Sequence, residues 1–146
     1  MPLQINNIFK DDNKVIAGRE GAVEVIVKAI RIHIDDANTC EKNCETLRNI
    51  IEINVLNQKR ACESGCLNTV CDVLLKYPNN EDILTSCFDI IRAIISNKEL
   101  YAKYCTPQFI KVITGAVKKR NNNERLSLLV ARTCLEVALN INDKNQ

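Results

Sequence analysis

Cysteine is the residue type in this sequence with the most obvious capacity for chemistry. Cysteines can form disulfides, hold zinc as thiolates, or act as a nucleophile beside a histidine base. The 146-residue chain has a single histidine, His33. Its eight cysteines are Cys40, Cys44, Cys62, Cys66, Cys71, Cys87, Cys105 and Cys134.

The spacing of these cysteines favours a simpler role as small apolar core residues. The pairs Cys40-x3-Cys44 and Cys62-x3-Cys66 fall at helical intervals on apolar faces. They fit zinc-ligand spacing only loosely, and His33 ends an apolar helical stretch where we expect a partly exposed side chain. We therefore predict reduced thiols, no metal and no cofactor. A zinc site, a cysteine nucleophile and a disulfide scaffold are the alternatives.

Composition is typical of a soluble globular protein. Hydrophobic residues make up 46% and charged residues 26%, and the net charge is +2. Such a balance does not predict nonspecific nucleic-acid binding. No apolar stretch approaches the roughly 18 residues that span a bilayer, and the first residues do not resemble a signal peptide. We expect a cytoplasmic or nucleocytoplasmic protein without membrane insertion.

Helical patterns that would position these side chains repeat along the chain. Gly21 aligns with Gly65, and each is followed by an apolar stripe of helical period, giving a repeat of about 43 to 44 residues. A third copy has Thr106 near the place of the glycine. Each long helix carries apolar residues in equivalent places, as in Cys40, Cys44, Leu47 and Ile51, then Ile83, Cys87, Ile90 and Ile94, then Ala131, Cys134 and Ala138.

The pattern predicts an all-α protein built from three units, each a short helix, a helix and a long helix. The short helices are expected at 12–19, 56–63 and 98–104. The units span about 13–54, 55–97 and 98–141. An N-terminal segment at 1–12 and a polar tail at 142–146 flank this repeat domain, which is either a whole protein or a piece of a longer array.

Two segments resemble the armadillo repeat. They are Ala17-Gly18-Arg19-Glu20-Gly21-Ala22-Val23 and Cys44-Glu45-Thr46-Leu47-Arg48-Asn49-Ile50. The family pattern has a small residue and a glycine opening the second helix and an "ALxNLA"-like third helix. The resemblance covers about residues 13–141 and implies an α-solenoid with a right-handed superhelix, whose third helices line a concave face. HEAT repeats, which lack the short first helix, are the nearest rival.

The resemblance also implies a non-catalytic adaptor or scaffold that binds a protein partner or extended peptide on its concave face. In nuclear-import receptors of this family, the third helix carries a tryptophan and, four residues on, an asparagine. The matching positions here are Glu45 and Asn49, Phe88 and Arg92, and Arg132 and Glu136. Only Asn49 keeps the family residue, which argues against binding of nuclear-localisation signals.

The residues themselves suggest how such a face would bind. Phe88 is expected to anchor an apolar side chain, and Arg92 and Arg132 to hold a carboxylate with two hydrogen bonds. No phosphate loop, catalytic triad or metal signature is present, so we predict that the chain is not an enzyme.

One stripe of the long helices differs between the three units. It is polar in the first and apolar in the others, as Glu41, Arg48 and Glu52, then Leu84, Ile91 and Ile95, then Leu128, Leu135 and Leu139. Either the later units bury this stripe against the preceding unit, or it forms apolar pockets in a groove.

A second apolar stripe on the last helix is expected to face outward. Val130, Val137 and Ile141 are spaced to share one side of it. That side predicts a homo-oligomer or a partner contact. The alternative function is accordingly a structural or oligomerisation unit that self-associates through this C-terminal face.

Overall fold

A computed structural model describes residues 11–118, 128, 131, 135 and 137–139. Within 11–118 the chain forms helices and short connections, and the described residues contain no strand, which confirms the all-α class. No helix in this part of the chain is both long and apolar enough to cross a bilayer. The helices are α2 (Asp11–Arg19), α3 (Ala22–Ile32), α4 (Ala37–Ile51), α5 (Val55–Glu63), α6 (Cys66–Lys76), α7 (Glu81–Ile95), α8 (Lys98–Tyr104) and α9 (Pro107–Lys118).

Helix lengths recur in order along the chain. The triplet α2, α3 and α4 has 9, 11 and 15 residues, and the triplet α5, α6 and α7 has the same three lengths. A 7-residue α8 and a 12-residue α9 follow. The three short helices begin within one residue of the positions that the sequence predicts, and they end at the predicted residues.

Asparagine and aspartate side chains cap the start of half of these helices. The side-chain oxygens of Asp36, Asn54, Asn80 and Asn97 each accept from the backbone N–H three residues later, at 2.9–3.2 Å. Each bond satisfies one of the N–H groups that the first turn leaves without a helical partner. The caps therefore fix where α4, α5, α7 and α8 start.

In each triplet, one glycine joins the first helix to the second. Gly21 and Gly65 have φ values of 86° and 81°, in the left-handed region that side chains with a Cβ disfavour. Each stands as the residue directly before the second helix, so the sharp α2–α3 and α5–α6 junctions depend on glycine.

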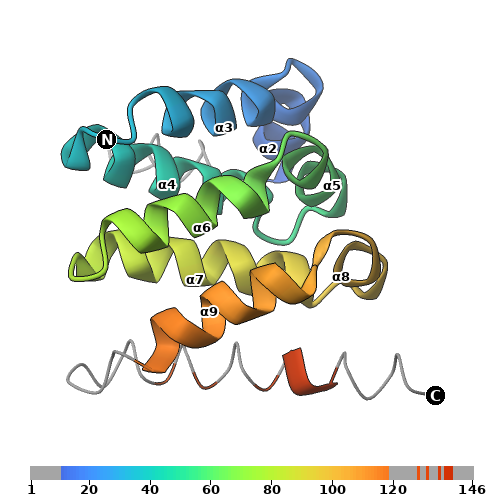
Figure 1. Ribbon diagram of the computed structural model, residues 1–146. Coiled ribbons are helices and arrows are strands. Elements are labelled where there is room, and N and C mark those ends of the chain that lie inside the picture. The colour runs from blue at the N-terminus through green and yellow to red at the C-terminus, as the bar shows by residue number, and fades with distance from the viewer. Residues whose placement is uncertain (1–10, 119–127, 129–130, 132–134, 136, 140–146) are drawn as a thin grey trace.

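Helices of the same kind stack on one another. α3 contacts α6 and α6 contacts α9, while α4 contacts α7 and α5 contacts both α2 and α8. Figure 1 shows α3, α6 and α9 one below another in front, α4 and α7 behind them, and the short helices to one side. The core lies between the layers and includes the fully buried Val27, Leu47, Val70 and Ile90. Burying each such side chain contributes about 1.5–3 kcal/mol.

The carboxyl end of α4 is closed by side chains from outside the helix. Lys14 Nζ donates to the Glu52 carbonyl at 3.0 Å, and Gln58 Nε2 donates to the Ile51 carbonyl at 3.0 Å. Asn57 Nδ2 donates to the carbonyls of Ile50 and Lys14 at 3.1 and 2.8 Å. Carbonyls that a helix end leaves unpaired are thus satisfied by buried polar groups, which lock α2, α4 and α5 together.

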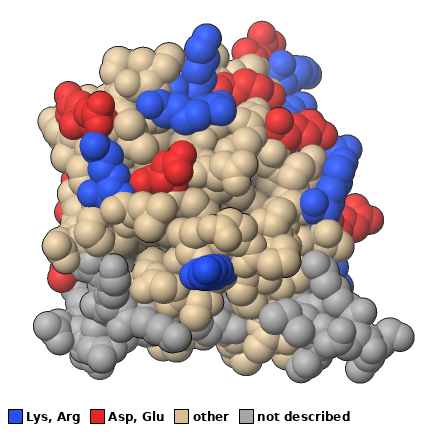
Figure 2. Space-filling model, viewed as in Figure 1, with Lys and Arg blue, Asp and Glu red and all other residues tan. Residues whose placement is uncertain are grey.

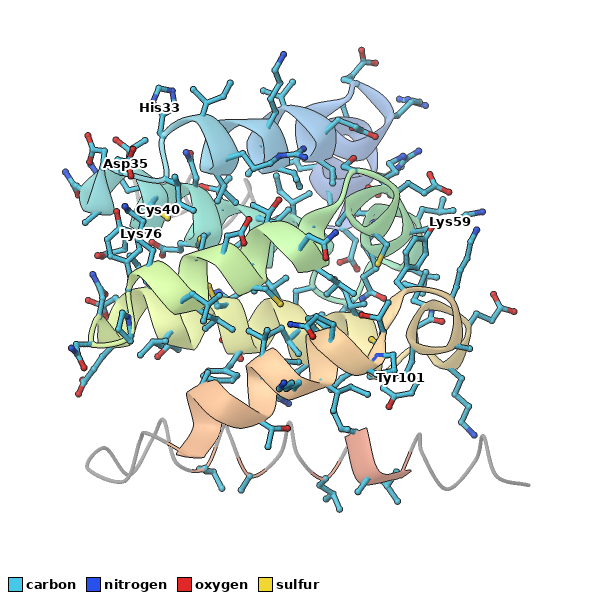
Figure 3. The ribbon with its side chains drawn as sticks, viewed as in Figure 1. His33, Asp35, Cys40, Lys59, Lys76 and Tyr101 are labelled. Atoms are coloured by element: carbon cyan, nitrogen blue, oxygen red, sulfur yellow. The ribbon has the colours of Figure 1, made fainter. Side chains whose placement is uncertain are left out.

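A second polar link joins the two triplets at the carboxyl end of α6. Lys76 Nζ lies 2.6 Å from the Asp35 carboxylate, and the Tyr77 hydroxyl donates to the Ile34 carbonyl. Figure 3 shows Lys76 and Asp35 meeting at this edge of the molecule. The hydrogen bond to Asp35 raises the pKa of Lys76 above its ordinary value. This link holds the α3–α4 turn against α6.

Candidate functional site

The cysteines occupy the core. Cys134 lies outside the described residues, and the other seven are free and buried. Burial raises the pKa of Cys62 and of Cys71 to about 12, and it also raises the pKa of Cys66. A hydrogen bond with Cys44, together with burial, raises the pKa of Cys40. These thiols therefore stay protonated at neutral pH, whereas nucleophiles and metal ligands act as thiolates.

His33 stands apart from those thiols. It follows α3 as its C-terminal cap residue and is exposed, as the sequence predicts. Its ring points away from Cys40 in Figure 3. Among the described residues, no group of three or more His, Cys, Asp and Glu is placed to hold a metal ion.

A polar groove runs between α4 and α7, and we call it the α4–α7 groove. Its larger part is a cavity of about 470 Å³ lined by Arg48, Asn49, Glu52, Ile53, Gln58, Asp89, Arg92, Ala93 and Ser96. It continues into a hollow of about 320 Å³ lined by Glu41, Glu45, Arg48, Asp82, Thr85 and Ser86. Arg48 borders both parts, so the groove extends along much of the two long helices.

Charges of alternating sign follow the groove. Glu45 lies 3.8 Å from Arg48, Arg48 lies 3.7 Å from Asp89 on the facing helix, and Asp89 lies 3.4 Å from Arg92. The side chains of Arg48, Asp89 and Arg92 are 25%, 29% and 34% exposed. Ion pairs at this exposure contribute little to the free energy of folding. A charged segment of a partner can therefore reach these groups and replace one of their ion pairs at little cost.

One stripe of the long helices is polar on α4 and apolar on α7. Each of the two helices buries one apolar stripe in the core. The stripe is Cys40, Cys44, Leu47 and Ile51 on α4, and Ile83, Cys87, Ile90 and Ile94 on α7. α7 also buries Leu84, Ile91 and Ile95, each at most 1% exposed. The equivalent α4 positions are Glu41, Arg48 and Glu52. In the second unit the stripe is therefore buried, although Leu84 also lines an apolar cavity between α6 and α9.

Three of the residues predicted for the concave face line the α4–α7 groove. Asn49 and Arg92 line its larger part, and Glu45 lines the smaller hollow. Phe88 differs from expectation: it is 0% exposed and belongs to the core, so its ring is not available as a surface anchor. The physical reason is that Phe88, four residues after Leu84, lies on the second buried stripe of α7. Arg132 and Glu136 lie outside the described residues.

The sequence interpretation missed two residues of the groove. The sequence places Arg48 only on the stripe that differs between the three units, and it does not single out Asp89 as a binding residue. Opposite charges three residues apart on one helix are close neighbours, and both Glu45–Arg48 and Asp89–Arg92 have this spacing. That signal would have identified the two residues.

The last helical segment also differs from expectation. Leu128, Leu135 and Leu139 are 54%, 59% and 51% exposed, which contradicts burial of their stripe against the preceding unit. The alternative, that the stripe forms groove pockets, stays a prediction. Val137, expected to face outward, is half-buried and packs against the core. Val130 and Ile141 lie outside the described residues. Among the described residues of this segment, the three leucines are thus exposed and Val137 is not.

Comparisons with known proteins give no relative that would assign this groove a role. No protein-family model matches the chain, and no curated protein or solved structure matches it at a significant level.

Proposed function

We propose that the chain is a short armadillo-type α-solenoid that works as a non-catalytic protein-interaction module. The recurring helix lengths, the two glycine junctions and the stacking of like helices support this architecture. The right-handed superhelix and the three-repeat division belong to the proposal. So does a cytoplasmic or nucleocytoplasmic location.

The observation that carries the proposal is the alternating row of charges in the α4–α7 groove. A partner segment in an extended conformation would place its own charges opposite Glu45, Arg48, Asp89 and Arg92. The two guanidinium groups bind carboxylates with two parallel hydrogen bonds, and Glu45 binds lysine or arginine. Asn49 supplies an amide beside them for the partner's backbone. The expected partner is a protein segment of mixed charge, and nucleic acid is not expected.

Affinity capture with a matched pair of charge variants tests this function. Wild type, Arg92→Glu and Lys59→Glu are each used as bait, and captured proteins are quantified by mass spectrometry. Lys59, labelled in Figure 3, is an exposed lysine of α5 that does not line the groove. A partner of the groove is depleted roughly tenfold by Arg92→Glu and retained by Lys59→Glu. Equal capture by all three baits would place binding elsewhere.

A second candidate function is self-association, and the exposed leucine stripe favours it. Leu128, Leu135 and Leu139 share one helical face, and more than half of each side chain is accessible. A second copy that covers the stripe would remove this apolar area from water. Sedimentation of wild type, Leu135→Lys and the control Val25→Lys distinguishes the outcomes, because Val25 is also an exposed apolar residue, on α3. A monomeric wild type excludes the candidate.

A further inference from the structure

A second groove lies between α6 and α9, and we call it the α6–α9 groove. It is a cavity of about 300 Å³ that shares no lining residue with the α4–α7 groove. Leu84 of α7 contributes to its wall, and Leu75 at its border is 67% exposed. Its lining residues are Leu74, Leu75, Pro78, Leu84, Gln108, Lys111, Val112, Gly115 and Ala116. In Figure 2, the surface over α9 is mostly uncharged, while charged side chains gather nearer α3.

Neither packing nor backbone conformation requires a glycine at position 115. Gly18 is packed so closely that a Cβ would come within 1.8 Å of Asn57, and Gly21 and Gly65 have positive φ. A Cβ on Gly115 would meet nothing within 4 Å, and its φ is an ordinary one. Glycine inside a helix nevertheless costs about 0.5–1 kcal/mol relative to alanine. The missing side chain does leave open space above the α9 backbone, inside the groove.

Lys111 gives the apolar groove one charge. It is exposed and lies four residues before Gly115, so both residues share one face of α9. No ion pair of Lys111 occurs among the described residues, where the acidic partners belong to Arg48, Lys76 and Arg92. An apolar cavity bordered by a single cation is complementary to a ligand that carries an apolar group and one carboxylate.

We propose that the α6–α9 groove docks a short amphipathic helix of a partner protein. One large apolar side chain of that helix fills the cavity above Gly115, where the absent Cβ lets the two backbones approach. A glutamate or aspartate about one turn away pairs with Lys111. This is the helix-in-groove mode of recognition, and it gives the protein a second binding face independent of the α4–α7 groove.

Labelled helical peptides test the proposal on the full chain. The probes are alanine- and glutamine-based peptides of about 16 residues, long enough for partial helicity. Each carries one central leucine or phenylalanine and, four residues on, either glutamate or lysine. Fluorescence anisotropy is expected to show the glutamate peptides binding roughly tenfold more tightly than their lysine counterparts. Lys111→Glu should reverse that preference, and the control Lys59→Glu should keep it.

Gly115→Ala separates binding from folding. The variant should raise the melting temperature, because alanine favours the helix, and weaken peptide binding roughly tenfold, because its methyl group enters the groove. Thr114→Ala is the matched control, since Thr114 is exposed on the same helix outside the lining of the groove.

The proposal is overturned if no peptide binds, if Gly115→Ala binds as wild type does, or if Lys111→Glu leaves the charge preference unchanged. Arg92→Glu should not alter peptide binding, so failure here leaves the α4–α7 proposal intact.

Discussion

The guanidinium of Arg48 on α4 lies 3.7 Å from the carboxylate of Asp89 on α7, so a charge pair bridges the two long helices. Asp89 also lies 3.4 Å from Arg92, and Arg48 lies 3.8 Å from Glu45. Each central charge thus has a neighbour on its own helix as well as one across the groove. An incoming segment can replace one contact of each group without leaving it unpaired.

The Arg48–Asp89 pair should contribute little to folding. A double-mutant cycle with Arg48→Ala and Asp89→Ala is expected to give a coupling of about 0.2–1 kcal/mol at low salt, because both groups are partly exposed. Urea denaturation measures it, and the coupling should shrink as salt is added. A coupling of several kcal/mol would identify the pair as a structural element and not an exchangeable one.

Lys14 should matter far more than other lysines. It is 7% exposed and donates to the Glu52 carbonyl, so Lys14→Met leaves a helix-end carbonyl without its charged donor. We expect a loss of about 1.5–3 kcal/mol in the free energy of unfolding. Chemical denaturation provides the measurement, with Lys59→Met as the exposed control on α5. Equal stability of the two variants would contradict the role given to Lys14.

Glycine-to-alanine substitutions should have opposite signs at different sites. Gly65→Ala forces a Cβ into the left-handed region at φ 81°, which costs about 1–2 kcal/mol. The nearest atom to such a Cβ is 3.6 Å away, so the loss arises from backbone strain and not from a clash. Thermal melts should therefore show a lower melting temperature for Gly65→Ala, in contrast to the rise expected for Gly115→Ala.

Stability should fall at alkaline pH because the core thiols resist ionisation. Cys62 has a folded-state pKa of about 12 against an ordinary value of 9.0. Between those values the unfolded state has lost the thiol proton that the folded state keeps, so the contribution is complete below about pH 9 and is lost as the pH rises towards 12. The loss is about 1.4 kcal/mol per pH unit for each such thiol.

Urea denaturation across this alkaline range provides the check. Removing one thiol in Cys62→Ala should make the slope of stability against pH shallower by that amount. Tyrosines and lysines also titrate here, but they are common to both proteins, so the difference in slope isolates the thiol. Identical slopes would show that Cys62 does not differ in pKa between the folded and unfolded states.

Local signals in the sequence were enough to predict the helices. The period of apolar residues, the capping asparagines and the paired glycines all act within a few residues, and they place α5 and α8 within one residue of their observed starts. Asn80 directly precedes α7 and accepts from the Ile83 N–H, which is the capping bond typical of asparagine at that place. The armadillo superhelix depends on how the units rotate against each other, and it stays a prediction.

Exposure was harder to predict than helicity. Phe88 and Glu45 occupy matching places in their helices, yet Phe88 is buried because it lies on an apolar stripe of α7 that is packed into the core. The matching stripe of α4 is polar. Val137 and Leu135 show the same difficulty, since a helix that is apolar nearly all round does not indicate which side faces inward. Gly115 and Lys111 were not predicted as binding residues. The groove that they line forms between α6 and α9, which are far apart in the sequence, so it leaves no local pattern.

The stacking of like helices has a consequence for how the chain is made. Helix pairs with extensive contact belong to one triplet or to neighbouring ones, and α2 has no such contact with α8 or α9. The polar links of Asn57 to Lys14 and of Tyr77 to Ile34 each span 43 residues. A chain leaving the ribosome can therefore complete the interface between α4 and α7 before α9 has been synthesised. Until then, the buried side of α6 that later receives α9 is the surface on which a nascent-chain chaperone would act.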